Sequence, residues 1–100
     1  MSILDDLAFD DNGYMLDQTA WTEEIAQALA DRDQFTLSEK HWEVIRFTRA
    51  WFFENGSPPT IRNVTRHLNL PTIELFQLFP GFPVKLAAKY AGLSEPAHCI

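Results

Sequence analysis

Apolar side chains recur at intervals of three and four residues along most of the chain after residue 19, as they do on one face of an α-helix. Thr19 can cap the first such segment, whose face is marked by Ile25 and Leu29. Ser38 can cap the second, which runs to Asn55-Gly56, a pair typical of a helix end. This second segment is apolar around much of its circumference, so we expect it to be the central, most buried element.

Three shorter helices are predicted after residue 57. Thr60 can cap the first, and the next two begin at Pro71 and Pro83, since proline is tolerated in the first turn of a helix. Gly92 ends the last helix, and Leu93 is placed for the apolar contact that usually follows a glycine cap. Residues 94–100 have no periodicity, which predicts a C-terminal arm outside the helical body.

The first twenty residues carry a different signal. Residues 7–16 place apolar side chains on either side of Asp11-Asn12-Gly13. Asn-Gly suits the two central positions of a type I′ turn, which both need a positive φ. We therefore expect an N-terminal β-hairpin lying on the helices, because two isolated strands are marginally stable.

The predicted fold is therefore mainly α: a small bundle of about five helices with an N-terminal β-hairpin and a flexible C-terminal arm. One hundred residues, 46% of them hydrophobic, suffice for one core and no more. We expect the body to span residues 1–93 and the arm to span residues 94–100.

The formal net charge is −6 and is unevenly distributed. The first fifty residues hold eleven acidic and four basic side chains, and the last fifty hold three and four. An acidic surface repels phosphate, which disfavours autonomous binding of nucleic acid. Residues 57–79 nevertheless resemble a helix-turn-helix with Arg62 and Arg66 on its first helix, so a DNA-associated regulator is kept as an alternative.

The chain opens with no charged segment followed by an apolar one, and no apolar run approaches the length that spans a membrane. Its single cysteine excludes a disulfide framework. We expect a cytoplasmic protein without membrane contact, because a free thiol persists in that compartment.

That single cysteine, Cys99, is the last residue but one. A thiol near a chain end has little structural use, although an incidental terminal residue is the alternative. Cys99 can act as a nucleophile or sulfur carrier if the thiolate is accessible, and neighbouring cations favour the thiolate. His98 is adjacent, and Lys85, Lys89 and Arg62 are the basic residues expected to border the arm.

Other groups predict less chemistry. His41, His67, His98 and Cys99 show no metal-ligand spacing, and no glycine-rich phosphate loop is present, so neither a metal nor a cofactor is expected. Aromatic residues fall at helix positions and are interpreted as core. They are Trp21, Trp42, Phe47, Trp51, Phe52 and Phe53.

Several segments resemble the DsrC/TusE family of sulfur-trafficking proteins. They are DNGYMLDQTAWTEEIAQAL, HWEVIRFTRAWFFENGSPPTIR and LFPGFPVKLAAKYAGLSEPAHCI, so that the similarity covers nearly the whole chain. The most specific parts are His41-Trp42-Glu43, Leu78-Phe79-Pro80, and Ala91-Gly92-Leu93 leading to Cys99. The family implies a small helical fold with an N-terminal hairpin and a mobile arm that bears the reactive cysteine.

The resemblance also implies partners. Members with a second cysteine in the last helix work with dissimilatory sulfite reductase, and Ala88 stands at that position here. The TusE-like branch needs only the terminal cysteine, which accepts persulfide sulfur from a TusBCD-like relay and passes it towards a tRNA 2-thiouridine synthetase. Two features depart from the family pattern: the stretch from Arg62 to Leu78 is several residues short, and Phe82 replaces a usual glycine.

The leading hypothesis is a sulfur carrier, or sulfurtransferase, that is loaded on Cys99. It is expected to be monomeric, to need no cofactor, and to meet its donor complex and its tRNA-modifying acceptor transiently. A DsrC-like accessory of a sulfite-reductase or sulfur-oxidation system is the alternative within the family.

Overall fold

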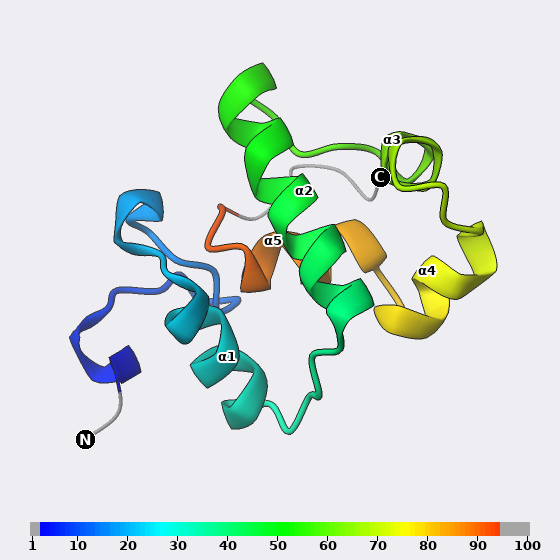
Figure 1. Cartoon of the computed structure of the whole chain (residues 1–100). Coiled ribbons are helices and arrows are strands. Elements are labelled where there is room, and N and C mark those ends of the chain that lie inside the picture. The colour runs from blue at the N-terminus through cyan, green and yellow to red at the C-terminus, as the bar shows by residue number, and fades with distance from the viewer. Residues whose placement is uncertain (1–2, 95–100) are drawn as a thin grey trace.

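Five α-helices form the body of the protein in a computed structural model that describes residues 3–94, apart from the side chain of Asp6. Two single-turn 3-10 helices, η1 (Ile3–Asp6) and η2 (Gln18–Ala20), precede them. The helices are α1 (Glu23–Arg32), α2 (Glu39–Asn55), α3 (Ile61–His67), α4 (Thr72–Leu78) and α5 (Pro83–Tyr90). The prediction of a mainly α fold with five helices is confirmed (Figure 1).

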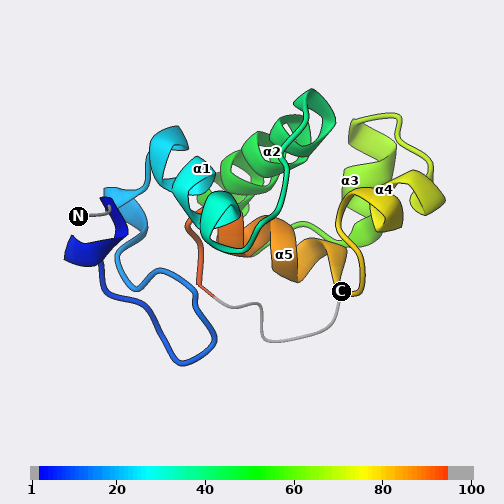
Figure 2. The same ribbon diagram turned by 90° about the horizontal axis from the view of Figure 1, so that it is seen from below.

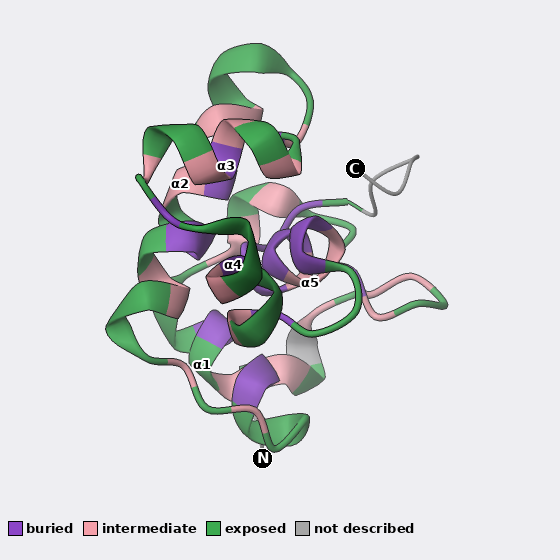
Figure 3. Cartoon of the chain, turned by 90° about the vertical axis from the view of Figure 1, so that its right-hand side faces the viewer, coloured by how far each residue is buried: buried purple, intermediate pink, exposed green. Residues whose placement is uncertain are grey.

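Helix α5 lies at the centre of this arrangement and packs against α1, α2 and α4 (Figures 1 and 2). Five of its side chains are buried: Pro83, Val84, Ala87, Ala88 and Tyr90. The much longer α2 buries only Val44, Ile45 and Thr48. The expectation that α2 is the most buried element is therefore wrong, because α2 covers α5 and turns its other face to solvent (Figure 3).

The ends of α2 follow from local chemistry, as predicted. Ser38 is the N-cap, and its backbone N–H donates to Nδ1 of His41 at 3.0 Å, which forms one half of a capping box. Gly56 ends the helix with φ at +81°, in the left-handed region where glycine has no steric penalty.

The start of α1 differs from the prediction. Thr22, not Thr19, caps this helix by accepting a hydrogen bond from the N–H of Ile25. Thr19 lies inside η2, where its N–H and hydroxyl both donate to the carboxylate of Asp17. Asp17 thus caps a separate 3-10 turn, which moves the helix start three residues along the chain.

The pair of short helices expected within residues 57–79 is present as α3 and α4. Thr60 caps α3 through a reciprocal arrangement with Asn63, in which the Thr60 hydroxyl accepts from the Asn63 N–H at 3.1 Å. Pro71 immediately precedes α4, and Pro83 is the first residue of α5, as predicted.

The predicted β-hairpin is wrong. Residues 7–16 contain one isolated antiparallel bridge, between Phe9 and Met15, and no strand. Of the pair Asn12-Gly13, only Gly13 has a positive φ, of +87°, so the expected type I′ turn, which needs two such residues, does not form. The carboxylate of Asp10 instead accepts from the backbone N–H groups of Asn12 and Tyr14, and the chain then buries Tyr14 and Met15 in succession. Consecutive buried side chains break the alternation that a two-stranded ribbon needs.

The core joins all five helices to residues that follow the turn. Its largest fully buried side chains include Met15, Leu29, Ile45, Phe79 and Leu93. Most of the aromatic set assigned to the core packs against it while partly buried, but Phe53 is 54% exposed. In the described part of the chain, no helix has the length and apolar character needed to cross a bilayer.

Candidate functional site

Two of the predicted site residues, the candidate nucleophile Cys99 and its neighbour His98, lie outside the described residues. The structure therefore describes only the part of the candidate site that belongs to the helical body. It describes the end of α5, the residues through which the chain leaves the body, and the three predicted cations Lys85, Lys89 and Arg62.

The chain leaves α5 through a Schellman motif. The N–H of Gly92 donates to the Lys89 carbonyl at 3.2 Å, and the N–H of Leu93 donates to the Ala88 carbonyl at 3.0 Å. Gly92 has φ +74°, and Leu93 is fully buried, as the sequence predicts. Ser94 is the first exposed residue after this motif, so the chain is held in the body as far as Leu93.

Two side chains from other elements hold the same end of α5. Trp21 donates from Nε1 to the Tyr90 carbonyl, and Arg49 donates from Nη1 to the Ala91 carbonyl, both at 2.8 Å. Trp21 also lies directly against Gly92, where a Cβ atom would stand 2.6 Å from Cγ of the indole. Any side chain larger than hydrogen at residue 92 therefore requires Trp21 to shift.

The guanidinium of Arg49 contacts two aromatic rings. Its Cζ atom lies 4.5 Å from the centroid of the Trp21 ring and 4.7 Å from that of Phe53. Nη2 donates to the Gln18 carbonyl at 2.8 Å. This desolvation lowers the pKa of Arg49, but an arginine remains charged at neutral pH.

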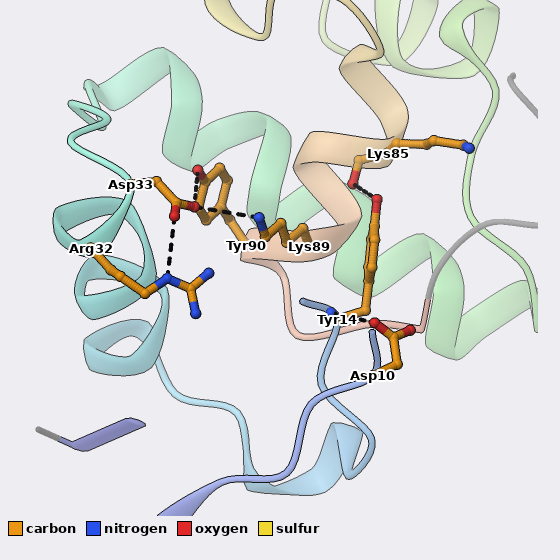
Figure 4. Close-up of polar contacts among 7 residues, drawn as sticks. All are labelled: Asp10, Tyr14, Arg32, Asp33, Lys85, Lys89 and Tyr90. Atoms are coloured by element: carbon orange, nitrogen blue, oxygen red, sulfur yellow. Dashed lines mark hydrogen bonds and ion pairs between the residues drawn. The ribbon is translucent and has the colours of Figure 1, made fainter. Parts of the chain in front are cut away.

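Lys89 belongs to a charged cluster beside the end of α1 (Figure 4). Its Nζ lies 3.5 Å from Asp33, which also accepts hydrogen bonds from the Tyr90 hydroxyl at 2.9 Å and from Arg32 Nε at 3.2 Å. Burial opposes ionisation of Asp33, but these donors and cations outweigh it and lower the pKa. Burial, followed by the hydrogen bond to Asp33, raises the pKa of Tyr90.

Lys85 and Arg62 lie elsewhere. Lys85 is in the first turn of α5 and points away from the Asp33 cluster, with Nζ 5.6 Å from the Phe82 ring centroid (Figure 4). Its backbone carbonyl accepts from the Tyr14 hydroxyl. Arg62 is exposed on α3. Two of the three predicted cations thus lie on α5 and one on α3, and Lys89 has a carboxylate partner that the sequence did not reveal.

Sequence reasoning assigned no role to Arg49 or Asp33, and it assigned Trp21 only to the core. Arg49 gives a weak signal, since it is the only charged residue within the aromatic-rich run FTRAWFF. The contacts that matter join residues far apart in the chain, and no local pattern encodes such pairs. Among residues 3–94, no three histidine or acidic side chains gather in a way that could hold a metal ion.

Two of the segments that appeared most specific in the sequence meet in space. His41 accepts the Ser38 N–H at Nδ1, and its Nε2 is 2.8 Å from the Leu78 carbonyl. A carbonyl only accepts, so Nε2 carries the proton and donates. His41 therefore ties the start of α2 to the end of α4 through its two ring nitrogens.

Comparison with known proteins identifies the family. The DsrC like protein family matches residues 4–100. The chain belongs to the DsrC-like family. It is 40% identical over 101 residues to the sulfurtransferase TusE of Pectobacterium atrosepticum, which covers 94% of this chain and 93% of the relative. It is 36% identical over 102 residues to the sulfurtransferase TusE of Salmonella typhimurium, covering 95% and 94%.

Solved DsrC structures share the fold. The solution structure of Allochromatium vinosum DsrC matches with a TM-score of 0.82 and 31% identity, covering 94% of this chain and 90% of the other. The oxidized gamma-subunit of the dissimilatory sulfite reductase (DsrC) from Archaeoglobus fulgidus matches with a TM-score of 0.83 and 33% identity, covering 94% and 92%. This DsrC-like chain is thus a sulfurtransferase of a sulfur relay that involves other proteins.

Proposed function

We propose that this DsrC-like protein carries sulfane sulfur on Cys99 and delivers it towards tRNA 2-thiouridine synthesis. The observation that carries the proposal is the single cysteine in a chain whose relatives are sulfurtransferases. A carrier that works through a thiol has no other sulfur available here, because both methionine sulfurs are thioethers and do not form persulfides.

The proposed reaction needs no external oxidant. The Cys99 thiolate attacks the outer sulfur of a donor persulfide, R–S–SH, which forms Cys99–S–SH and releases the donor as a thiolate, R–S⁻. An acceptor thiolate then attacks the outer sulfur of Cys99–S–SH. The acceptor becomes the persulfide, and the Cys99 thiolate is regenerated. One sulfane sulfur and its proton move in each step, and the electrons balance.

The residue at position 88 favours this route over an internal disulfide cycle. The resemblance to the family implies that Ala88 stands where two-cysteine members have their second cysteine, and its side chain on α5 is fully buried. Because residue 88 has no sulfur, Cys99 has no partner within the chain. The Cys99 thiol and the Cys99 persulfide must therefore react with another molecule, which in this proposal is a second protein.

The proposed partners are a TusBCD-like donor complex and a tRNA 2-thiouridine synthetase, met in turn in the cytoplasm. In this scheme residues 1–93 are a docking body, and residues 94–100 present the thiol. Lys85, Arg62 and His98 remain candidates for favouring the thiolate. Lys89 is a weaker candidate, because Asp33 offsets its charge at close range.

Loading is tested by mass spectrometry of the intact protein after incubation with a persulfidated donor. The wild type is expected to gain about 32 Da, the mass of one sulfur, and to lose it with reductant. Cys99→Ser is expected to keep its circular dichroism spectrum and gain nothing. A reducible adduct on the serine variant would refute the assignment of Cys99.

The choice of partners is tested by copurification under crosslinking. Recovery of relay and tRNA-thiolating proteins supports the proposed route. Recovery of sulfite-reductase subunits in their place would contradict it and favour a role like that of the DsrC structures.

A further inference from the structure

Two sets of hydrogen bonds hold the end of α5: those of the Schellman motif and those from Trp21 and Arg49. The last carbonyls of a helix have no partner inside the helix, and the Schellman hydrogen bonds to Ala88 and Lys89 already satisfy two of them. Trp21 and Arg49 satisfy the next two, those of Tyr90 and Ala91, from outside the helix. They are 69 and 42 residues away in sequence, so these bonds fix α5 relative to other elements rather than merely ending it.

The hydrogen bonds from Trp21 and Arg49 depend on particular side chains. Arg49 contacts two aromatic rings and donates to the carbonyls of Ala91, just after α5, and of Gln18 in η2. A planar guanidinium with donors in a fixed fork suits these contacts better than the compact ammonium of a lysine. Desolvating a cation opposes folding, and the Schellman motif already ends the helix. The arrangement therefore does more than cap α5: it holds Tyr90, Ala91 and Gly92 against η2, the start of α1 and α2.

We propose that Trp21 and Arg49 are positioning residues that fix the point at which the cysteine-bearing arm leaves the body. This inference rests on the proposed carrier role of Cys99. We call the two residues, with their bonds to Tyr90, Ala91 and Gln18, the root clamp.

Covalent geometry shows why the root matters. Cys99 is five residues beyond Ser94, so its α-carbon lies within about 18 Å of that of Ser94 even when the chain is fully extended. A partner docked on the body therefore meets a thiol confined to a volume centred on Ser94. The effective concentration of the thiol in the partner's active site depends on where that centre lies. The rate at which a freely diffusing small molecule reacts with Cys99 does not depend on the position of Ser94.

The chain offers matched controls for this idea. Arg46 lies on α2 three residues before Arg49, and its guanidinium also contacts a tryptophan, Trp42, at 5.4 Å from the ring centroid. It pairs with the exposed Glu23 and not with the end of α5. Arg46→Lys and Trp42→Phe therefore repeat the chemical changes of Arg49→Lys and Trp21→Phe without removing a bond to the end of α5.

The experiment compares two sulfur sources for each full-length variant. One is a persulfidated TusBCD-type donor complex, and the other is glutathione persulfide. Arg49→Lys and Trp21→Phe are expected to lower kcat/KM with the protein donor about tenfold and leave the rate with glutathione persulfide unchanged. Both control variants are expected to match the wild type with both sources. If Trp21 and Arg49 only stabilised the fold, their variants would melt at a lower temperature. The rates of loading from the protein donor and from glutathione persulfide would then change by the same factor.

A further variant avoids any disturbance of the fold. Insertion of two glycines after Ser94 leaves the root clamp intact but lengthens the tether, and it is expected to slow the protein donor alone. If the insertion and both clamp variants load from the protein donor at the wild-type rate, the inference is overturned. If the wild type itself takes no sulfur on Cys99 from either source, the proposed carrier function fails instead.

Discussion

Replacing Gly92 with alanine tests the packing at the root directly. A Cβ at residue 92 would stand 2.6 Å from Cγ and 2.7 Å from Cβ of Trp21. These indole atoms are close to the backbone of residue 21, so the clash cannot be relieved by moving the end of a flexible chain. Trp21 must shift, and it then loses its hydrogen bond to the Tyr90 carbonyl and its contact with Arg49.

The magnitude follows from these losses. Holding a non-glycine residue at φ +74° costs about 1–2 kcal/mol. The hydrogen bond contributes about 1 kcal/mol, and the cation–π contact adds about 0.5–1 kcal/mol. Gly92→Ala is therefore expected to lower the free energy of unfolding by about 3 kcal/mol, which corresponds to a melting temperature roughly 12–24 °C lower in a domain of this size.

Gly81→Ala is the matched control. Gly81 has φ +93°, but a Cβ there meets nothing within 4 Å, so only the backbone term of about 1–2 kcal/mol applies. Urea denaturation followed by circular dichroism measures both variants. If Gly92→Ala is no more destabilising than Gly81→Ala, the contact between Trp21 and Gly92 does not hold the root, and the reasoning is refuted.

Two further predictions concern stability. His41→Ala removes the partner of the Ser38 N–H and the bond to the Leu78 carbonyl, and is expected to cost about 1–2 kcal/mol in urea denaturation; an unchanged midpoint would contradict this role of His41. The lowered pKa of Asp33 means that its contribution is present above the ordinary carboxyl pKa of about 3.9 and is lost as the pH falls through its lower folded value. Thermal melts are therefore expected to show a shallower acid loss in Asp33→Asn than in the wild type, and equal slopes would count against it. The raised pKa of Tyr90 has the opposite sign, so stability is expected to fall as the pH rises above about 10, and less so in Tyr90→Phe.

Local chemistry made the helix ends predictable. Ser38, Gly56, Thr60 and Gly92 act through side chains or dihedral angles within a few residues, so the sequence contains all that decides them. The start of α1 was misplaced because two threonines compete, and Asp17 settles the competition by capping η2.

Long-range packing explains what sequence reasoning missed. The Asn12-Gly13 signal was real, but burial of Tyr14 and Met15 overrides the ribbon that it normally forms. Lys89 was expected beside the arm, yet its partner Asp33 comes from the end of α1. The prediction for Cys99 rests on its position in the sequence, whereas the root clamp depends on contacts that only the folded chain creates.

The central claim is that sulfur passes through Cys99 on its way between proteins, and a chase experiment tests it most directly. The protein is loaded, freed from donor and mixed with acceptor, while mass spectrometry follows the peptide that contains Cys99. The account predicts that the adduct of about 32 Da leaves this peptide at the rate at which the acceptor gains sulfur. An adduct that stays on Cys99, or an acceptor that gains sulfur equally well with Cys99→Ser in the complete relay, would contradict it.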